Sequence, residues 1–188
     1  MEDYEYYYKH YRSKYYNACS EIRSCEQEIY SLTQQRNSVT TRITALNTKI
    51  KNTDNAITAL DKILGHEGTI ATKIANVNTK MEAAAINYSG MVNSEDVTNK
   101  NLKDTYQEED RTASTAISNA FASVRAKKAS LTSTLAALKK DLQSAQQELE
   151  GINSRIGTLK YNLSYWKNQK TNSFYNMEYY RKKMSAVN

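Results

Sequence analysis

Residues 131–163 read LTSTLAALKKDLQSAQQELEGINSRIGTLKYNL. Apolar residues recur here at alternating intervals of four and three, beginning with Leu131, Leu135 and Leu138, and the same pattern continues in both directions. Its positions are Ile117, Phe121, Val124, Lys128, Leu131, Leu135, Leu138, Leu142, Ala145, Leu149, Ile152, Ile156, Leu159, Leu163, Trp166, Lys170, Ser173, Met177, Tyr180, Met184 and Val187. A repeat of 3.5 residues indicates a helix that coils against another helix, because a straight α-helix has 3.6 residues per turn. We therefore predict a long helix over residues 117–188.

A second stripe of the same kind begins near the N-terminus. Its positions are Tyr4, Tyr8, Tyr11, Tyr15, Ala18, Ile22, Cys25, Ile29, Leu32, Arg36, Val39, Ile43, Leu46, Ile50, Thr53, Ile57, Leu60 and Leu64. This stripe predicts a long helix over residues 1–64, in which Arg36 and Thr53 are polar interruptions. Two helices of similar length in one chain most simply fold back on each other. The predicted fold is all-α, an elongated antiparallel coiled-coil hairpin.

The segment between the stripes, residues 65–116, has weaker signals. Gly65-His-Glu-Gly68 predicts a helix break, because glycine adopts the backbone conformations that end helices. A helix of about five turns should follow and end at Ser89-Gly90. After a loop near residues 91–98, Asp96 or Thr98 can cap a further helix. We expect this short helical insertion to form a three- to four-helix bundle at one end of a single domain, residues 1–188. The stripe of its first helix consists of Ile70, Ile74, Val77, Met81, Ala84 and Tyr88.

The composition supports long helices with little interior. The 188 residues include no proline and five glycines, and 39% of the residues are hydrophobic. A globular domain of this length would contain roughly nine prolines, so a turn-rich β protein is excluded. No apolar run reaches the ~18 residues that cross a membrane, and the N-terminus lacks a Sec signal. Cys19 and Cys25 cannot bridge each other on one helix, and we interpret Cys25 as a small core residue.

Tyrosine is concentrated at the two ends of the chain. Residues 4–16 and residues 161–180 contain twelve of the fifteen tyrosines, and an antiparallel hairpin would bring both groups together. Exposed tyrosine clusters are typical of binding surfaces, because tyrosine combines rigid apolar area with a hydroxyl group. We predict a protein contact surface here; a partly buried aromatic end is the structural alternative. The tyrosines outside the core stripes are Tyr6, Tyr7, Tyr16, Tyr161, Tyr165, Tyr175 and Tyr179.

The sequence contains few groups that could support catalysis. His10 lies among tyrosines and His66 lies in the glycine-containing break, and no acid or thiol is spaced to join either on a helix face. Neither the converging ligands of a metal site nor a phosphate-binding loop occurs. The acidic run Glu108-Glu109-Asp110 fits a solvated helix face. We therefore expect a protein that is not an enzyme and needs no cofactor.

Charge is distributed unevenly over a formal total of +6. The predicted segments 1–64, 65–116 and 117–188 carry +1, −3 and +8. A basic helix can follow a nucleic-acid backbone, but the lysines are scattered and no known nucleic-acid module is present. Nucleic acid is the partner that the sequence favours least. A structural protein that assembles with copies of itself through its coiled coils is a further alternative.

Several features together resemble a family of bacterial accessory proteins. They are the start YYYKHYRSKYYNACSEIRSCEQEI (residues 6–29), two regular coiled-coil stripes, a glycine break and a short helix that closes in Tyr88-Ser-Gly90. This combination resembles the YwqH-like proteins encoded beside LXG toxins in Gram-positive bacteria with type VII secretion. The Tyr88-Ser-Gly90 segment is similar to the Trp-x-Gly turn of the helical-hairpin substrates of that system, with tyrosine in place of tryptophan.

The resemblance implies a targeting or chaperone-like role. Such a protein would bind the helical N-terminal domain of a toxin and present the complex to the secretion machinery. Tyr106 with Asp110, and Phe174 with Glu178, are similar to the aromatic-x-x-x-acid export signals of these systems, although composition alone predicts such matches. The resemblance also implies synthesis in the cytoplasm, and it leaves open whether the protein is exported with its partner without a Sec signal.

Overall fold

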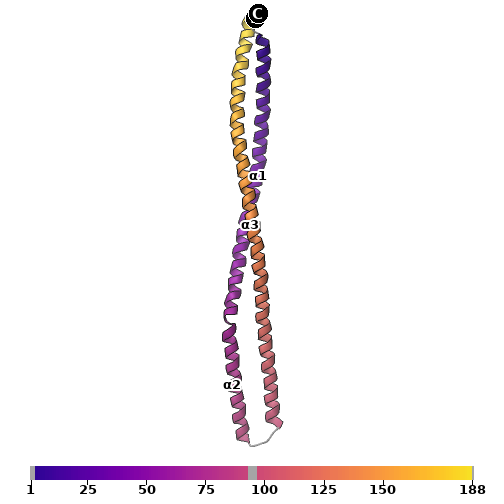
Figure 1. Cartoon of the computed structure of the whole chain (residues 1–188), viewed down its shortest axis with the longest axis vertical. Coiled ribbons are helices and arrows are strands. Elements are labelled where there is room, and N and C mark those ends of the chain that lie inside the picture. The colour runs from indigo at the N-terminus through magenta and orange to yellow at the C-terminus, as the bar shows by residue number, and fades with distance from the viewer. Residues whose placement is uncertain (1–2, 93–96, 188) are drawn as a thin grey trace. The chain divides into compact units, whose positions relative to one another are not determined.

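The described part of the chain folds into three helices (Figure 1). The computed structural model describes residues 3–92 and 97–187, and the side chains of residues 3–84 and 104–186. The helices are α1 (Tyr4–Gly65), α2 (Glu67–Val92) and α3 (Val97–Val187), and the described residues contain no strand. The all-α prediction is therefore confirmed. The chain divides into two compact units, Met1–Asn47 with Asp141–Asn188, and Thr48–Lys140.

The first unit pairs the N-terminal part of α1 with the C-terminal part of α3. Glu28 accepts a hydrogen bond from Arg155 at 2.9 Å, and Glu148 accepts one from Arg42 at 2.6 Å. The residue number therefore rises along α1 while it falls along α3, so the two helices are antiparallel within one molecule. The hairpin-like pairing predicted from the sequence is confirmed for this unit.

The two predicted stripes form the contact between the helices. Every stripe position with a described side chain, from Tyr4 to Leu64 and from Ile117 to Met184, is buried or half-buried. The most buried positions of the first unit include Ala18 and Ala145, both 0% exposed, and Leu159, which is 5% exposed. Cys25 lies in this core, as predicted, and Cys25 and Cys19 are both free. The core is a single seam, which agrees with the low hydrophobic content.

Local interactions explain where α1 begins. The Asp3 side chain accepts a hydrogen bond from the Tyr6 backbone N–H at 2.9 Å. This is an N-cap, in which a carboxylate satisfies one of the amide groups that a helix leaves without an internal partner. Glu5 in the first turn also favours the helix, because acidic groups interact well with the positive end of the helix dipole.

The second unit contains the end of α1, all of α2 and the first part of α3. Asp61 of α1 pairs with Lys128 of α3 at 2.5 Å, and Glu67 of α2 pairs with Arg125 of α3. Phe121, which is 7% exposed, is its most buried hydrophobic residue among those described. The structure has two helices side by side here, α1 followed by α2 against α3. The predicted three- to four-helix bundle is therefore wrong in its number of helices.

The glycines interrupt the helices less than predicted. Between α1 and α2 only His66 leaves the helix, and its carbonyl oxygen accepts a hydrogen bond from the Ile70 N–H at 3.0 Å. Gly68 lies in the first turn of α2, and the helix resumes at once. The predicted helix from Asp96 or Thr98 and the predicted long C-terminal helix form one continuous α3, although Asp96 lies outside the described residues.

The turn predicted at Tyr88-Ser-Gly90 is also wrong. These residues lie within α2, which continues to Val92. A glycine inside a helix costs only about 1 kcal/mol relative to alanine, and this cost does not end a helix whose neighbours favour it. The backbone of Tyr88 and Gly90 is therefore helical, and the similarity to a Trp-x-Gly turn has no structural counterpart in the described residues.

Candidate interaction surfaces

The tyrosines outside the core stripes are exposed in the first unit. On α1, Tyr6, Tyr7 and Tyr16 are 60%, 41% and 58% exposed. On α3, the exposed fractions of Tyr161, Tyr165, Tyr175 and Tyr179 are 75%, 49%, 68% and 53%. Exposed rings therefore lie on both helices, and two of those on α3 contact rings of the seam region: Tyr179 lies 5.1 Å from Tyr180, and Tyr175 lies 6.1 Å from Phe174.

The α1 group belongs to a cluster of rings that joins the two helices. Tyr180 of α3 stacks on Tyr7 and Tyr11 of α1, with ring centroids 5.1 Å and 5.8 Å apart, and contacts Tyr4 at 6.4 Å. Tyr6 extends the cluster outward through an edge contact with Tyr7 at 5.4 Å. The inner rings fill the seam, and the outer rings present apolar area to solvent.

A second group of rings lies one to two turns further along α1. Tyr15 of α1 contacts Phe174 of α3 at 6.0 Å, and Tyr16 lies at 5.5 Å from Tyr15. The Arg12 guanidinium lies 5.7 Å from the centre of the Tyr16 ring, which is the geometry of a cation–π contact. Phe174 is 43% exposed. It belongs to the aromatic group of residues 161–180, and the sequence also matches it to an export motif with Glu178.

Sequence reasoning missed one exposed aromatic residue. Tyr30 of α1 is 69% exposed and lies on a shallow surface with Arg23, Glu26 and Gln27. Its position follows directly after the stripe residue Ile29, so the heptad pattern alone already placed it outside the seam. An inspection of every tyrosine against the stripe would have found it.

The exposed tyrosines of α3 follow a heptad pattern of their own. If the seam positions are called a and d, Tyr161 and Tyr175 occupy f positions, and Tyr165 and Tyr179 occupy c positions. Positions c and f lie on the side of a helix opposite to a and d. These four rings therefore point away from α1. The outer stripe, defined as all c and f positions from 161 to 179, consists of Tyr161, Tyr165, Asn168, Asn172, Tyr175 and Tyr179.

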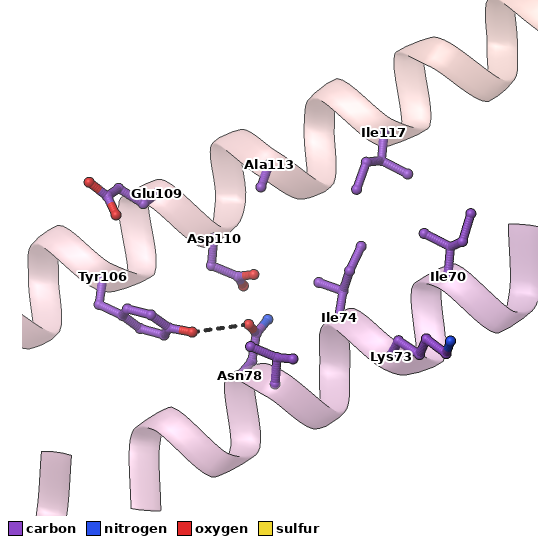
Figure 2. A pocket seen from close by; sticks show the side chains of 10 residues that line it. Ile70, Lys73, Ile74, Asn78, Tyr106, Glu109, Asp110, Ala113 and Ile117 are labelled. Atoms are coloured by element: carbon purple, nitrogen blue, oxygen red, sulfur yellow. Dashed lines mark hydrogen bonds between the residues drawn. The ribbon is translucent and has the colours of Figure 1, made fainter. Parts of the chain in front are cut away.

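The second unit contains an apolar groove between α2 and α3 (Figure 2). The groove has a volume of about 420 Å³. It is lined by Ile70, Lys73, Ile74, Val77, Asn78, Tyr106, Glu109, Asp110, Ala113 and Ile117. Tyr106 donates a long hydrogen bond of 3.4 Å to the Asn78 side-chain oxygen across it. The structure thus brings Tyr106 and Asp110, the predicted export motif, together on the wall of this groove.

One apolar edge of α2 beside the groove is not covered. Ile70, Val77 and Met81 are 36%, 52% and 46% exposed, whereas Ile74 and Asn78 are half-buried. Of the predicted α2 stripe positions with a described side chain, Ile74 is half-buried, whereas the others are exposed: Ile70, Val77, Met81 and Ala84. The helix turns Ile74 and Asn78 toward α3, and the other side of its apolar stripe faces solvent.

The remaining polar groups form no site for metal chemistry in the described part of the chain. There, no group of three or more His, Cys, Asp or Glu side chains is placed to hold a metal ion. His10 stacks on Tyr6 at 6.2 Å and contacts Tyr11 at 5.2 Å, so it belongs to the aromatic cluster. Within the described residues, no helix combines the length and the hydropathy required to cross a membrane.

Comparisons of the chain with protein-family models, with curated proteins and with solved structures find no match.

Proposed function

We propose that the protein is an adaptor that binds a helical protein, with the helical N-terminal domain of a secreted LXG-type toxin as its partner. In this role it helps to present the toxin to the type VII secretion machinery. The observation that carries the proposal is the amount of large apolar side chain that two paired helices leave uncovered, in both units. Contiguous exposed apolar area on a protein surface marks interaction sites.

The groove of the second unit suits a helix as its ligand. Its walls are the sides of α2 and α3. The exposed Ile70 and Val77 line the α2 wall, and the exposed Met81 follows Val77 four residues further along α2. An amphipathic helix binds such a groove through apolar residues at intervals of three, four and seven. A third helix on this face would cover the side of the α2 stripe that α3 leaves exposed.

The charged residues of the groove favour one orientation of a bound partner helix over the reverse orientation. Lys73 lies on the α2 wall, and Glu109 and Asp110 lie on the α3 wall. A partner helix with a basic edge toward α3 and an acidic edge toward α2 would match them. Charge pairs of this kind contribute more to orientation and association rate than to affinity.

The tyrosines of α1 supply a second contact for the same partner. Tyr6, Tyr7 and Tyr16 are held by the cluster around Tyr180 and Tyr15. Rings held in this way lose little conformational freedom on binding, which is why tyrosine is frequent among the residues that dominate binding energy. The α1 tyrosines therefore form a contact site of the first unit, separate from the groove of the second unit.

Co-expression with the helical N-terminal domain of the toxin encoded by the adjacent gene tests this proposal. The adaptor and the toxin domain should co-purify as a stable complex, and titration calorimetry should give its dissociation constant. The proposal fails if no LXG-type reading frame flanks the gene, or if the two proteins form no complex when they are made together.

A matched pair of variants locates the site. Ile70→Asp with Val77→Asp places two charges on the apolar edge of α2, and should raise the dissociation constant at least tenfold, because desolvating each charge opposes binding. Thr72→Asp with Thr79→Asp adds the same charges at the same spacing on exposed positions of α2 that do not line the groove. Equal weakening by both pairs would contradict a role for the groove.

A further inference from the structure

The outer stripe of α3 has an internal symmetry. Its six positions read Tyr, Tyr, Asn, Asn, Tyr, Tyr, at intervals of four, three, four, three and four residues. The order is the same from either end, with its centre at residue 170. We infer from this symmetry that the outer stripe binds the same stripe of a second copy of the chain, in antiparallel orientation.

An antiparallel pair centred at residue 170 places like residues opposite each other. Tyr161 then faces Tyr179 of the second copy, Tyr165 faces Tyr175, and Asn168 faces Asn172. In an antiparallel coiled coil each a-type position faces a d-type position, and the c and f positions of this stripe have that relation. The pairing is also reciprocal, as a two-fold interface between identical surfaces requires.

The chemistry of each layer suits burial between two helices. Two tyrosine layers at each end of the stripe supply apolar area and ring contacts. The Asn168 and Asn172 side chains can hydrogen-bond to each other between copies, and any register that leaves these buried amides without a partner is penalised. The tyrosines therefore supply affinity, and the asparagines supply specificity.

The residues beside the stripe carry almost no charge. On one side of the stripe lie Asn162, Gln169 and Asn176, followed by Lys183, whose ammonium lies 5.6 Å from the centre of the Tyr179 ring. On the other side lie Ser164, Thr171 and Glu178. In the proposed register Lys183 faces Gly157 of the second copy. Glu178 pairs with Arg181 on its own helix at 2.8 Å. Two identical surfaces that approach each other therefore meet no opposing like charges, although residues 117–188 as a whole are strongly basic. Depletion of charge together with enrichment in tyrosine is typical of the centre of protein interfaces.

The area available matches what a specific dimer needs. A tyrosine side chain offers about 150–250 Å², and the four in this stripe are 49–75% exposed, so the eight rings of two copies would bury about 1,000 Å² in total. Specific interfaces begin near about 1,000 Å² of total buried area. The dimer would leave Tyr6, Tyr7 and Tyr16 of α1 outside this interface, because they lie on the other helix. A two-fold pairing closes at two copies, so it does not predict filaments.

Sedimentation velocity of the full chain over a range of concentrations tests the inference. The mass should approach twice 21.4 kDa as concentration rises. Tyr165→Glu with Tyr175→Glu places a glutamate opposite a glutamate in two layers, and should raise the dimer dissociation constant about a hundredfold or more. Tyr165→Lys with Tyr175→Glu places lysine opposite glutamate in the same layers. Its dimer dissociation constant should be at least tenfold lower than that of the Glu/Glu variant.

The charge-pair variant distinguishes this register from any other use of the surface. If only the loss of the tyrosines weakens the dimer, the Glu/Glu and Lys/Glu variants will have the same dimer dissociation constant. That result overturns the inference. A chain that stays monomeric at about 100 μM, or a Glu/Glu variant that stays dimeric, overturns it as well. Tyr30→Glu is the control, because it adds a charge at an exposed aromatic position of α1 and should leave the dimer unchanged. Far-ultraviolet circular dichroism verifies that each variant remains helical.

This test is independent of the proposed adaptor function. Loss of dimerisation with retained toxin binding would support both ideas, because the groove and the α1 tyrosines lie outside the outer stripe. Retained dimerisation without any toxin complex would refute only the adaptor.

Discussion

Replacing Leu159 by alanine should destabilise the first unit substantially. Leu159 is 5% exposed and lies in the seam between α1 and α3, next to Ile156 at 6%. Truncation removes about three carbon groups, and at about 0.8 kcal/mol for each buried group the transfer term is about 2.4 kcal/mol. Leucine-to-alanine changes in cores cost about 2–5 kcal/mol. Because this seam is one layer thick and can relax toward solvent, we expect the lower end, about 2–3 kcal/mol.

Urea unfolding followed by circular dichroism at 222 nm measures this loss. Tyr30→Ala is the control, because Tyr30 is 69% exposed and its removal should change the free energy of unfolding by less than about 0.5 kcal/mol. The reasoning is refuted if the two variants unfold at the same urea concentration. That result would mean that Leu159 is not buried in solution.

Two further substitutions and one double-mutant cycle test other features of the helices. Gly151→Ala should stabilise the protein by about 0.5–1 kcal/mol in the same unfolding assay, because Gly151 is inside α3 and an added Cβ would meet nothing within 4 Å; destabilisation would indicate a bend there. Ala145→Leu should cost about 1–3 kcal/mol, since Ala145 is 0% exposed and the seam has no room for a larger side chain; a thermal melting temperature equal to that of the wild type would contradict this. A double-mutant cycle on Glu28 and Arg155, which are 41% and 57% exposed, should give a coupling of about 0.2–1 kcal/mol that decreases with salt; a coupling that is independent of salt would argue against a surface ion pair.

The coiled-coil seam could be predicted from the sequence because its period is long and unbroken. Over many heptads, only one face of each helix repeats at 3.5 residues, so the buried positions follow directly. Even Lys128, Lys170 and Ser173, which are polar, are buried or half-buried at the stripe positions where the pattern puts them. Lys128 is accommodated by its ion pair with Asp61.

The arrangement of the middle segment could not be predicted in the same way. The predicted breaks at Gly65–Gly68 and near residues 91–98 suggested separate short helices, and therefore a bundle of three or four helices. Which side of the α2 stripe faces α3 depends on tertiary packing, and the structure turns Ile74 inward and Val77 outward. The sequence shows that this side of α2 is apolar, but it does not show which helix covers it.

The candidate surfaces were predictable in part. The exposed tyrosines follow from their positions outside the stripe, and the structure places each of them at the surface. Their division between α1 and the outer face of α3 became apparent only when the helices were paired. The groove at Tyr106 and Asp110 required the structure, because its walls belong to two different helices, α2 and α3, whose facing sides depend on tertiary packing.

Zero-length cross-linking tests the central structural claim, that the N-terminal and C-terminal stripes pair within one molecule. Lys167 of α3 lies 3.5 Å from Glu26 of α1, so a carbodiimide should join them as an amide without any substitution in the chain. The experiment uses an equal mixture of unlabelled and ¹⁵N-labelled protein, with cross-linked peptides identified by mass spectrometry. The structure predicts a Glu26–Lys167 product in which both peptides carry the same label. The claim would be contradicted if cross-linked pairs of one labelled and one unlabelled peptide were as abundant as pairs with the same label. It would also be contradicted if no Glu26–Lys167 product formed.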